Sequence, residues 1–554
     1  MPTISVRVDD LYRLLGVELD VKSLVRLMTK LKCEIEEMAG GNLVYEANHD
    51  RPDLFSAEGL SRALKHLLGL PVRRPTVSDC GAAAYAEPVP GRPYVAFAIV
   101  RNVELDDEAL KQIIQLQEKL HTTYGRNRRK ASIGLYDLDK VKPPIYYRAV
   151  DPDNTRYRPL GYGKEMSLRE VLGQTDKGRE YGHIIDKMEK YPVIADSEGR
   201  ILSLAPILNS EDAKVTTSTR NVLIDSTGLD PRVVVDMVTI VAYSLFERGR
   251  NTEICLVETR YSNGERIAAP RVEGVVQELT IGQVNSLLGT EMSVKEAASL
   301  LGVFGYDVVE AAGDKLVVRA PPYRIDVLSW VDVAEDVAIG YGYERLGEEA
   351  NELPPSRGSG REDEVEHLSD LLRGVLVSMG FSEVANYMMT SVDVDVRLYN
   401  RRVEPVVVAN PISERFTSLR TWLTAGLVNF IVENKNKATE FRIFEVGDVV
   451  FVREGRVYEE RRVGTAISSP EATLTDGLAV VNTLLNAIGL NPAFREGEVD
   501  GLLRERTAEI IVSDEKVGFV GEVHPEVLLK LDYDRPIVTA EIDVGKILKV
   551  LRKQ

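Results

Sequence analysis

The sequence is poor in cysteine and contains no long apolar run. Its three cysteines, Cys33, Cys80 and Cys255, lie far apart and form no CxxC motif. We therefore expect neither a disulfide framework nor a zinc site, as is typical of a protein kept in the reducing cytoplasm. No run of about 18 apolar residues occurs, and the N-terminus lacks the charged stretch and apolar core of a secretory signal. These absences predict a soluble cytoplasmic protein with no membrane contact.

Basic residues are outnumbered by acidic ones. The 69 Lys and Arg residues and the 86 Asp and Glu residues give a net charge of −17. Because binding phosphates requires clustered positive charge, this balance excludes a nucleic-acid footprint over the whole surface and leaves only a local contact. One dense basic island, residues 126–130 (RNRRK), follows a predicted helix that ends near Gly125. By pattern alone, a solvated helix end is favoured over a phosphate site there.

The chain is long enough for several domains. With 554 residues, of which 44% are hydrophobic, it can bury several cores. We predict a multidomain α+β protein. A small α+β domain over residues 1–85 is followed by a central α/β domain over residues 90–265 and a second small α+β domain over residues 270–347. A linker over residues 348–361 then leads to a large domain, residues 362–554, built on a mainly antiparallel sheet. A Pro-, Gly- and Ala-rich link is expected over residues 75–93.

The two small domains repeat one another. Residues 14–69 align with residues 287–342 at a constant offset of 273 without a gap, and many more positions are identical than chance would give. Leu-Leu-Gly at 14–16 recurs at 287–289, and a Val-Lys pair follows a predicted N-cap in both segments. The sequence therefore predicts two copies of one small α+β unit.

The second copy concentrates acidic side chains. After Pro321 and Pro322, Ser329 is a plausible N-cap, and the apolar spacing predicts a helix from residue 330. Three acids share one face of this helix and a fourth precedes it: Asp332, Glu335, Asp336 and Asp326. Acids in a first turn complement the helix macrodipole, but a cluster of this size repels itself unless a cation such as Mg²⁺, or an arginine from a partner, neutralises it.

The first copy keeps the frame of this segment and lacks its acidic face. Arg51 and Asp53 align with Arg324 and Asp326. The three helical acids, in contrast, align with Gly59, Arg62 and Ala63. Dipole complementation would benefit both copies equally. We therefore favour a metal or interface role for the acidic face over dipole complementation.

A polar segment of the central domain is a candidate pocket. Residues 206–228 are rich in short hydrogen-bonding side chains and follow a hairpin predicted over residues 190–204. Loops between strands have a similar composition, so a pocket and a connecting loop remain alternatives at this point. Helices are predicted on either side, over residues 108–124 and 231–248.

Several short stretches of the sequence are informative because of their order and spacing. They are residues 48–53 (NHDRPD), 116–121 (LQEKLH), 133–144 (IGLYDLDKVKPP), 190–194 (KYPVI), 209–211 (NSE), 323–328 (YRIDVL) and 333–343 (VAEDVAIGYGY). Taken together, and along almost its whole length, the chain resembles the beta subunit of phenylalanyl-tRNA synthetase in its archaeal and eukaryotic cytosolic form.

The resemblance implies an α₂β₂ phenylalanine–tRNA ligase, which joins L-phenylalanine to tRNA(Phe) and converts ATP to AMP and diphosphate. ATP and the aminoacylation chemistry would lie in the alpha subunit. The C-terminal domain here would resemble a class II synthetase domain that has lost its catalytic motifs. The sequence agrees, because residues 441–445 (FRIFE) depart from the FRxE spacing and no GxGxGxER segment occurs near the end. Without an arginine pair for the triphosphate, this domain is expected to form a subunit interface.

The resemblance also implies that the central domain hydrolyses tyrosine misattached to the tRNA. A phenylalanine pocket rejects an isostere with one extra hydroxyl only weakly, so a second site that reads the hydroxyl raises specificity. The implied editing pocket comprises Ser203, Asn209, Ser210, Glu211, Asp225 and Thr227. Glu211 or Asp225 would recognise the hydroxyl, and Ser203 or Thr227 would orient the attacking water.

A metal site is implied as well. The resemblance assigns Mg²⁺ to Asp326, Asp332, Glu335 and Asp336, near the boundary with the alpha subunit. Two other hypotheses stay open at this point. The chain could be a non-enzymatic scaffold that has a degenerate editing site and only binds the partner subunit and tRNA, or a binding module with no role on tRNA.

Overall fold

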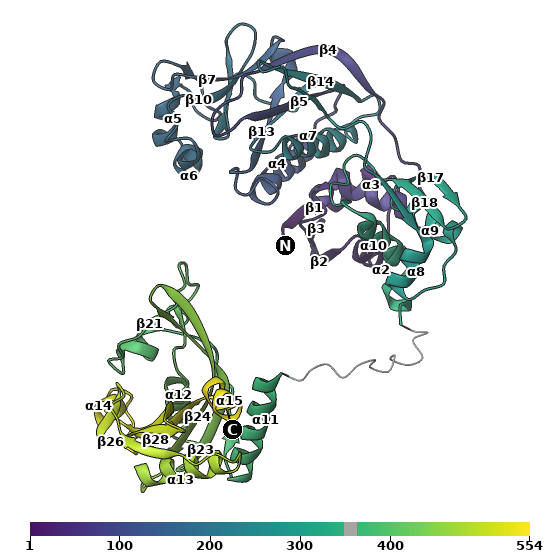
Figure 1. Cartoon of the computed structure of the whole chain (residues 1–554). Coiled ribbons are helices and arrows are strands. Elements are labelled where there is room, and N and C mark those ends of the chain that lie inside the picture. Colours follow the sequence, from purple (N-terminus) through teal and green to yellow (C-terminus); the bar gives the residue numbers. More distant parts are fainter. Residues whose placement is uncertain (348–362, 554) are drawn as a thin grey trace. The chain divides into compact units, whose positions relative to one another are not determined.

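The computed structural model describes residues 1–347 and 363–553, so the linker predicted over residues 348–361 lies outside the described residues. The chain divides into two units, Met1–Leu353 and Pro354–Gln554 (Figure 1). Each unit combines helices with mainly antiparallel sheets. The protein is therefore a multidomain α+β chain, as the sequence predicts.

The first small domain is a three-stranded antiparallel sheet with helices. Its elements are β1 (Thr3–Arg7), α1 (Val8–Leu15), α2 (Val21–Lys30), β2 (Cys33–Ala39), β3 (Asn42–Ala47), the 3₁₀ helix η1 (Pro52–Leu54) and α3 (Ala57–Leu67). The strand order is β1-β3-β2. Gly16 ends α1 at a φ of 83°, a left-handed conformation that glycine adopts without a steric penalty.

The second small domain repeats this arrangement. Its elements are β16 (Val276–Thr280), α8 (Ile281–Leu288), α9 (Val294–Gly302), β17 (Asp307–Ala312), β18 (Lys315–Arg319), α10 (Trp330–Tyr341) and the 3₁₀ helix η4 (Tyr343–Arg345). The bounds of β1 and α1, shifted by 273 residues, coincide with those of β16 and α8. The irregularity in β2 between Ile35 and Glu37 recurs in β17 between Val308 and Glu310. The duplicated sequence thus folds into duplicated structure, down to one bulge.

A ten-stranded sheet forms the central domain. Its elements are β4 (Val77–Ala86), β5 (Tyr94–Arg101), α4 (Asp107–Thr122), β6 (Ala131–Asp137), η2 (Leu138–Lys140), β7 (Ile145–Val150), β8 (Arg156–Tyr157), β9 (Met166–Ser167), α5 (Leu168–Gln174), α6 (Asp176–Tyr181), η3 (Gly182–Ile184), β10 (Tyr191–Ala195), β11 (Ile201–Leu204), β12 (Leu208–Asn209), β13 (Val222–Gly228), α7 (Pro231–Phe246), β14 (Glu253–Tyr261) and β15 (Arg266–Ala269). The order is β12-β11-β10-β7-β4-β14-β5-β13-β6, with β15 beside β14. Helix α7 packs on β5 and β13, and α4 packs on β6 and α7 (Figure 1).

The link expected over residues 75–93 is largely a strand of this sheet. Strand β4 pairs in parallel with β14 on one side and with β7 on the other. Its Ala- and Gly-rich sequence has low strand propensity, and pairing with neighbours on both sides overrides that propensity. The expected end of the first domain at residue 85 therefore falls inside the central sheet.

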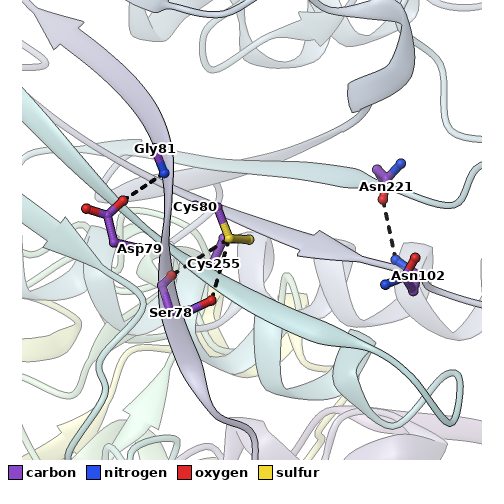
Figure 2. Close-up of a disulfide and its surroundings, with 7 residues drawn as sticks. All are labelled: Ser78, Asp79, Cys80, Gly81, Asn102, Asn221 and Cys255. Carbon is purple, nitrogen blue, oxygen red and sulfur yellow. Dashed lines mark hydrogen bonds between the residues drawn. A yellow bond between two sulfur atoms is a disulfide. The ribbon is translucent and has the colours of Figure 1, made fainter.

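A disulfide joins β4 to β14. Cys80 and Cys255, 175 residues apart in sequence, are bonded across this pair of strands, with their Cα atoms 5.4 Å apart (Figure 2). Cys33 is free and buried. The expectation that the cysteines form no disulfide is thus wrong, because strand pairing, which sequence spacing does not reveal, brings the two thiols together.

The C-terminal unit is built on an eight-stranded sheet. Its elements are α11 (Glu364–Ser378), β19 (Ser382–Glu383), β20 (Met389–Thr390), the π helix η5 (Asp393–Arg397), β21 (Glu404–Pro405), β22 (Ser418–Leu419), α12 (Thr424–Glu433), β23 (Phe441–Arg453), β24 (Arg456–Ser468), α13 (Leu474–Asn486), β25 (Ala493–Glu496), β26 (Leu502–Val512), β27 (Glu515–Val523), α14 (Pro525–Lys530), β28 (Ile537–Asp543) and α15 (Val544–Leu551). The order is β19-β23-β24-β28-β27-β26-β25, with β21 also beside β23, and only the β19–β23 pair is parallel. The mainly antiparallel sheet predicted here is observed.

The strands of this unit differ widely in length. Strand β19 has only two residues. Strands β23 and β24 form a hairpin with 13 residues in each strand. Among residues 1–347 and 363–553, no helix combines the length and apolar character that crossing a membrane would require.

Candidate functional site

A cavity of about 270 Å³ opens in the central domain beside α4, β6, β11, β12 and β13. Most of its wall is apolar and includes Leu105, Leu110, Ile113, Ile133, Leu135, Ile207 and Val222. Four of the six predicted editing residues also line it: Ser203, Asn209, Ser210 and Asp225. An apolar wall with a few convergent polar groups is typical of a small-ligand site.

Asp225 is the buried acid of this cavity. It lies in the middle of β13, paired with Gly134 of β6 and Phe97 of β5. Burial raises the pKa of its carboxyl group to about 7, although a hydrogen bond from Tyr136, the charge of Arg92 and the backbone of Gly134 act in the opposite direction. Near neutral pH, this carboxyl group can therefore either accept or give up a proton.

Tyr136 and Gly134 hold this carboxylate in place. The Tyr136 hydroxyl donates to Asp225 Oδ1 at 2.7 Å, and burial raises the pKa of Tyr136 well above its ordinary value, which keeps it a donor. A Cβ atom at position 134 would lie 2.2 Å from Asp225 Oδ1 and 2.5 Å from the Tyr136 hydroxyl oxygen. The carboxylate can approach β6 this closely only because residue 134 is glycine.

The three other cavity residues come from the segment that follows β10. Ser203 of β11 pairs in register with Asn209 of β12. The Asn209 side-chain amide donates to the carbonyl of Leu135 at 3.3 Å, and the Ser210 hydroxyl donates to the carbonyl of Arg158 at 3.3 Å. The polar composition of residues 206–228 therefore reflects a pocket wall as well as a connecting loop.

Two predicted editing residues do not line the cavity. Thr227 lies two residues beyond Asp225 on the same strand and is buried, where its hydroxyl accepts a hydrogen bond from Arg92 Nε at 2.8 Å. Glu211 accepts from the backbone amide of Gly161 at 2.8 Å and lies 3.5 Å from the Lys214 ammonium group. As a result, Asp225 is the one carboxylate among the predicted editing residues that reaches the cavity.

Several residues of the cavity wall are not among the candidates that the sequence indicates, although two of them fall within residues 116–121. The wall also includes Glu118, His121, Arg128 and Lys177. Burial lowers the pKa of His121 to about 4, so its ring is neutral at pH 7, and its Nε2 accepts from the backbone amide of Ile133 at 2.9 Å. Helix periodicity places Glu118 and His121 on α4 but does not reveal that a cavity borders them, and Arg128 and Lys177 lie outside that helix.

The acidic segment of the second small domain is held together by an arginine of the same chain. Arg324 makes a bidentate pair with Asp326, at 2.9 and 2.7 Å, and its Nη2 also donates to Asp336 Oδ2 at 2.7 Å. Tyr306 donates to the same Asp336 oxygen at 2.7 Å. Burial alone would raise the pKa of Asp326, but the charges of Arg324 and Arg51 outweigh it and the pKa is lowered.

The other two acids of this segment have separate partners. Asp332 accepts hydrogen bonds from the backbone amides of Leu328 and Ser329 and completes a capping box at the start of α10. Glu335 pairs with Lys32 of the first copy at 2.7 Å, which links the two copies.

This arrangement does not fit the expected Mg²⁺ site. Asp326 and Asp336 share Arg324, whereas Asp332 and Glu335 have partners elsewhere, and the described residues contain no group of three or more acids, histidines or cysteines that could hold a metal ion. The reason is that Arg324 already supplies the neutralising charge between Asp326 and Asp336. The sequence left open an arginine from a partner as the neutralising group, and the structure provides that arginine from within the chain.

Comparisons with known proteins agree with this architecture. Three family models match: the B3/4 domain over residues 105–257, which contains the cavity, the tRNA synthetase B5 domain over residues 277–343, and the phenylalanyl tRNA synthetase beta chain CLM domain over residues 350–544. Fold and matches together define the class of protein, a subunit of a tRNA synthetase.

Relatives narrow this class. The chain is 43% identical to the phenylalanine–tRNA ligase beta subunit of Thermofilum pendens over 99% of this chain and 98% of that protein, and 41% identical to that of Pyrobaculum aerophilum over 98% and 100%. An N-terminal fragment of the phenylalanyl-tRNA synthetase beta subunit from Pyrococcus horikoshii superposes with a TM-score of 0.59 at 37% identity, covering 62% of this chain and all of the fragment. The chain belongs to the family of phenylalanine–tRNA ligase beta subunits.

Proposed function

We propose that this chain assembles with an alpha subunit into an α₂β₂ phenylalanine–tRNA ligase and that its cavity hydrolyses tyrosyl-tRNA(Phe). The observation that carries the second part is Asp225, a buried carboxyl group with a pKa of about 7 in an otherwise mainly apolar cavity. ATP, together with the Mg²⁺ that the ligase uses, would act in the alpha subunit.

Asp225 accounts for discrimination between the two amino acids. A tyrosine ring would rest against the leucine and isoleucine side chains of the wall, and its hydroxyl would donate to Asp225. Phenylalanine would leave the carboxyl group desolvated and without this partner. A site built around a buried polar group rejects an analogue that lacks the matching hydroxyl far more strongly than an apolar pocket distinguishes sizes.

Ser203 is the candidate for orienting the attacking water. It lies on the cavity wall, where its hydroxyl is 3.5 Å from the carbonyl of Leu208 and also interacts with the Tyr136 hydroxyl beside Asp225. Water would attack the ester carbonyl carbon, the bond from that carbon to the ribose oxygen would break, and the products would be tyrosine and uncharged tRNA. Of the two alternatives that the sequence left open for each role, we therefore favour Asp225 over Glu211 and Ser203 over Thr227.

The C-terminal unit is proposed to contribute assembly rather than catalysis. Glu445, the acid of the FRIFE segment, is held by Arg420 and by the side-chain amide of Asn386 at 2.7 Å. Arg442 stacks over the ring of Phe381. Both charged groups of the segment thus have structural partners inside the unit, which supports a role other than binding a triphosphate.

The test compares alanine variants of Asp225 and Glu211, the two carboxylates that the sequence offers equally as the group that recognises the tyrosine hydroxyl. Asp225→Ala is expected to lower tyrosyl-tRNA(Phe) hydrolysis by the assembled ligase at least tenfold, while phenylalanine charging persists. Glu211→Ala, whose carboxylate lies outside the cavity, is the matched control and is expected to hydrolyse normally. Equal activity of both variants would refute the site. A wild-type complex that does not hydrolyse tyrosyl-tRNA would instead favour the scaffold hypothesis.

A further inference from the structure

The basic island noted in the sequence forms an unusual turn beside the cavity. Arg126, Asn127 and Arg128 have φ values of 49°, 52° and 64°. Three successive residues with side chains in the left-handed region are uncommon, because each costs conformational energy that the surrounding structure has to offset. The turn follows α4 and leads into β6, two elements that contribute to the cavity wall.

Arg128 anchors this turn to the cavity. Its Nη1 donates to the carbonyl of Ile207 at 2.9 Å, its Nη2 donates to Glu118 Oε1 at 2.8 Å, and its guanidinium lies over the ring of Tyr181. The backbone carbonyl of Arg128 in turn accepts from Arg92 Nη1 at 3.0 Å. The conformation of the turn is therefore fixed in part by two residues of the cavity wall, Glu118 and Ile207.

The neighbouring arginines have no such partners. Arg126 and Arg129 are exposed, and within residues 1–347 and 363–553 neither guanidinium group makes an ion pair or a hydrogen bond. Most other arginines of the same domain are paired; Arg156, Arg158 and Arg169, for example, each contact a carboxylate. In a chain with a net charge of −17, two cations without a partner among the described residues thus lie three positions apart on a strained, anchored turn.

We propose that the turn formed by residues 126–130 binds phosphates of the unpaired 3′ end of tRNA and guides the terminal aminoacyl group into the cavity. This inference rests on the proposed hydrolytic function. The cavity accommodates one amino-acid side chain, so the nucleotides that carry it must lie outside and adjacent to it. Their phosphates require cations free of protein partners, and Arg126 and Arg129 supply them next to the wall residue Arg128.

A solvated helix end is the competing explanation, and it does not account for the geometry. Lys119 already lies in the last turn of α4, where a cation complements the dipole. Three left-handed residues are not needed for that purpose. Strain that is maintained by contacts with a pocket wall is characteristic of functional sites.

Binding to two RNAs tests the proposal with the full-length chain. Wild type and the double variant Arg126→Gly/Arg129→Ala are titrated with uncharged tRNA(Phe) and with the same tRNA trimmed of its unpaired 3′ end. Glycine at 126 removes the charge and suits the left-handed conformation, so the turn is retained. The variant is expected to bind intact tRNA several-fold more weakly, and to bind trimmed tRNA as wild type does.

Salt dependence gives a second measure. The slope of log affinity against log salt for intact tRNA should decrease by about 1.4, from about 0.7 per lost single-strand phosphate contact. Over a fourfold increase in salt concentration, the affinity of the double variant should therefore fall by a factor about seven times smaller than that of wild type. The double variant Arg126→Lys/Arg129→Ala, which keeps one of the two charges, should show only about half of this decrease in slope. Arg148→Ala, at an exposed position on β7 that does not line the cavity, is the matched control and should leave both affinities unchanged.

Hydrolysis separates this proposal from the proposed function. The double variant should raise KM for tyrosyl-tRNA(Phe) several-fold and change kcat by less than twofold, whereas Asp225→Ala should lower kcat and leave tRNA affinity intact. Equal weakening of both RNAs, or of neither, would overturn the role of the turn. If the double variant binds intact tRNA more weakly than wild type does, but the wild-type complex performs no hydrolysis, the turn is retained as an RNA contact and only the hydrolytic function is refuted.

Discussion

Arg324 donates a hydrogen bond at 2.7 Å to Asp336, twelve residues later in the second repeat copy, and the same guanidinium group donates to Asp326. In the first copy, Arg51 donates two hydrogen bonds to Asp53 in the same way, but position 63, which corresponds to Asp336, is alanine. Both copies therefore share the pair of arginine and aspartate, and only the second copy adds another carboxylate to it. The acidic face that suggested a metal site is, in its buried part, an ion-pair network.

Asp336→Asn should destabilise the second small domain. The substitution removes a buried charge partner, and Arg324 keeps only Asp326. We expect a loss of roughly 2–4 kcal/mol, below the full cost of an unpaired buried charge. Glu335→Gln, which alters a half-exposed pair with Lys32, should cost about 0–1 kcal/mol. Urea unfolding followed by domain-specific hydrogen exchange measures both; a difference that requires Mg²⁺ would reinstate the metal site.

Hydrolysis of tyrosyl-tRNA should depend on pH through Asp225. If the carboxylate is the active form, the rate should rise with pH through about 7 and level off above it. Ser203→Ala should lower the rate and leave this inflection in place. The pH–rate profile under single-turnover conditions is the measurement, and a profile that is flat between pH 6 and 8 would contradict the role of Asp225.

Titration of Asp225 should also change the free energy of unfolding, which should fall with rising pH where the rate of hydrolysis rises. The pKa of Asp225 is higher in the folded chain, about 7, than its ordinary value of 3.8. The folded state then binds the extra proton between these values, so the free energy of unfolding should fall as pH rises across this window and stay constant above it. Asp225→Asn removes the titrating group. Its stability relative to wild type should increase from pH 4 to pH 7, as urea titrations at each pH would show.

Gly134→Ala should disrupt the cavity. The new Cβ would overlap Asp225 Oδ1 at 2.2 Å, within a strand that cannot shift freely. We expect a loss of roughly 1–3 kcal/mol from overpacking, together with loss of hydrolysis. Gly173→Ala is the matched control, because that glycine lies in α5 with open space around it and should gain helix propensity. Equal stability of the two variants would show that the close approach is not required.

Reduction of the Cys80–Cys255 disulfide should lower stability. Its loss frees the unfolded chain from a long closed loop, for which about 2–4 kcal/mol is typical. Under denaturing, non-reducing conditions one thiol, that of Cys33, should react, and three should react after reduction. Adding a reductant should shift the unfolding transition of wild type and leave that of Cys80→Ser/Cys255→Ser unchanged. Three reactive thiols before reduction would exclude the disulfide.

Local features of the sequence predicted much of the secondary structure. Ser329 caps α10, Asp20 caps α2 and Gly16 ends α1, as expected from their positions. Such signals act over three or four residues, so a linear reading recovers them. The repeat was also visible at a constant offset, because two copies of one unit preserve the same spacing of caps and core positions.

Contacts between distant segments had to come from the tertiary structure. Strand order decided that Cys80 meets Cys255, that Asp225 faces Gly134 and Tyr136, and that Glu211 and Thr227 lie outside the cavity. The chain alone determined that Arg324, Asp326 and Asp336 lie close along the sequence, but only packing determined that the arginine sits between the acids. Residue identity and spacing set which groups are available, whereas burial and pairing in the folded sheet set their protonation and their partners.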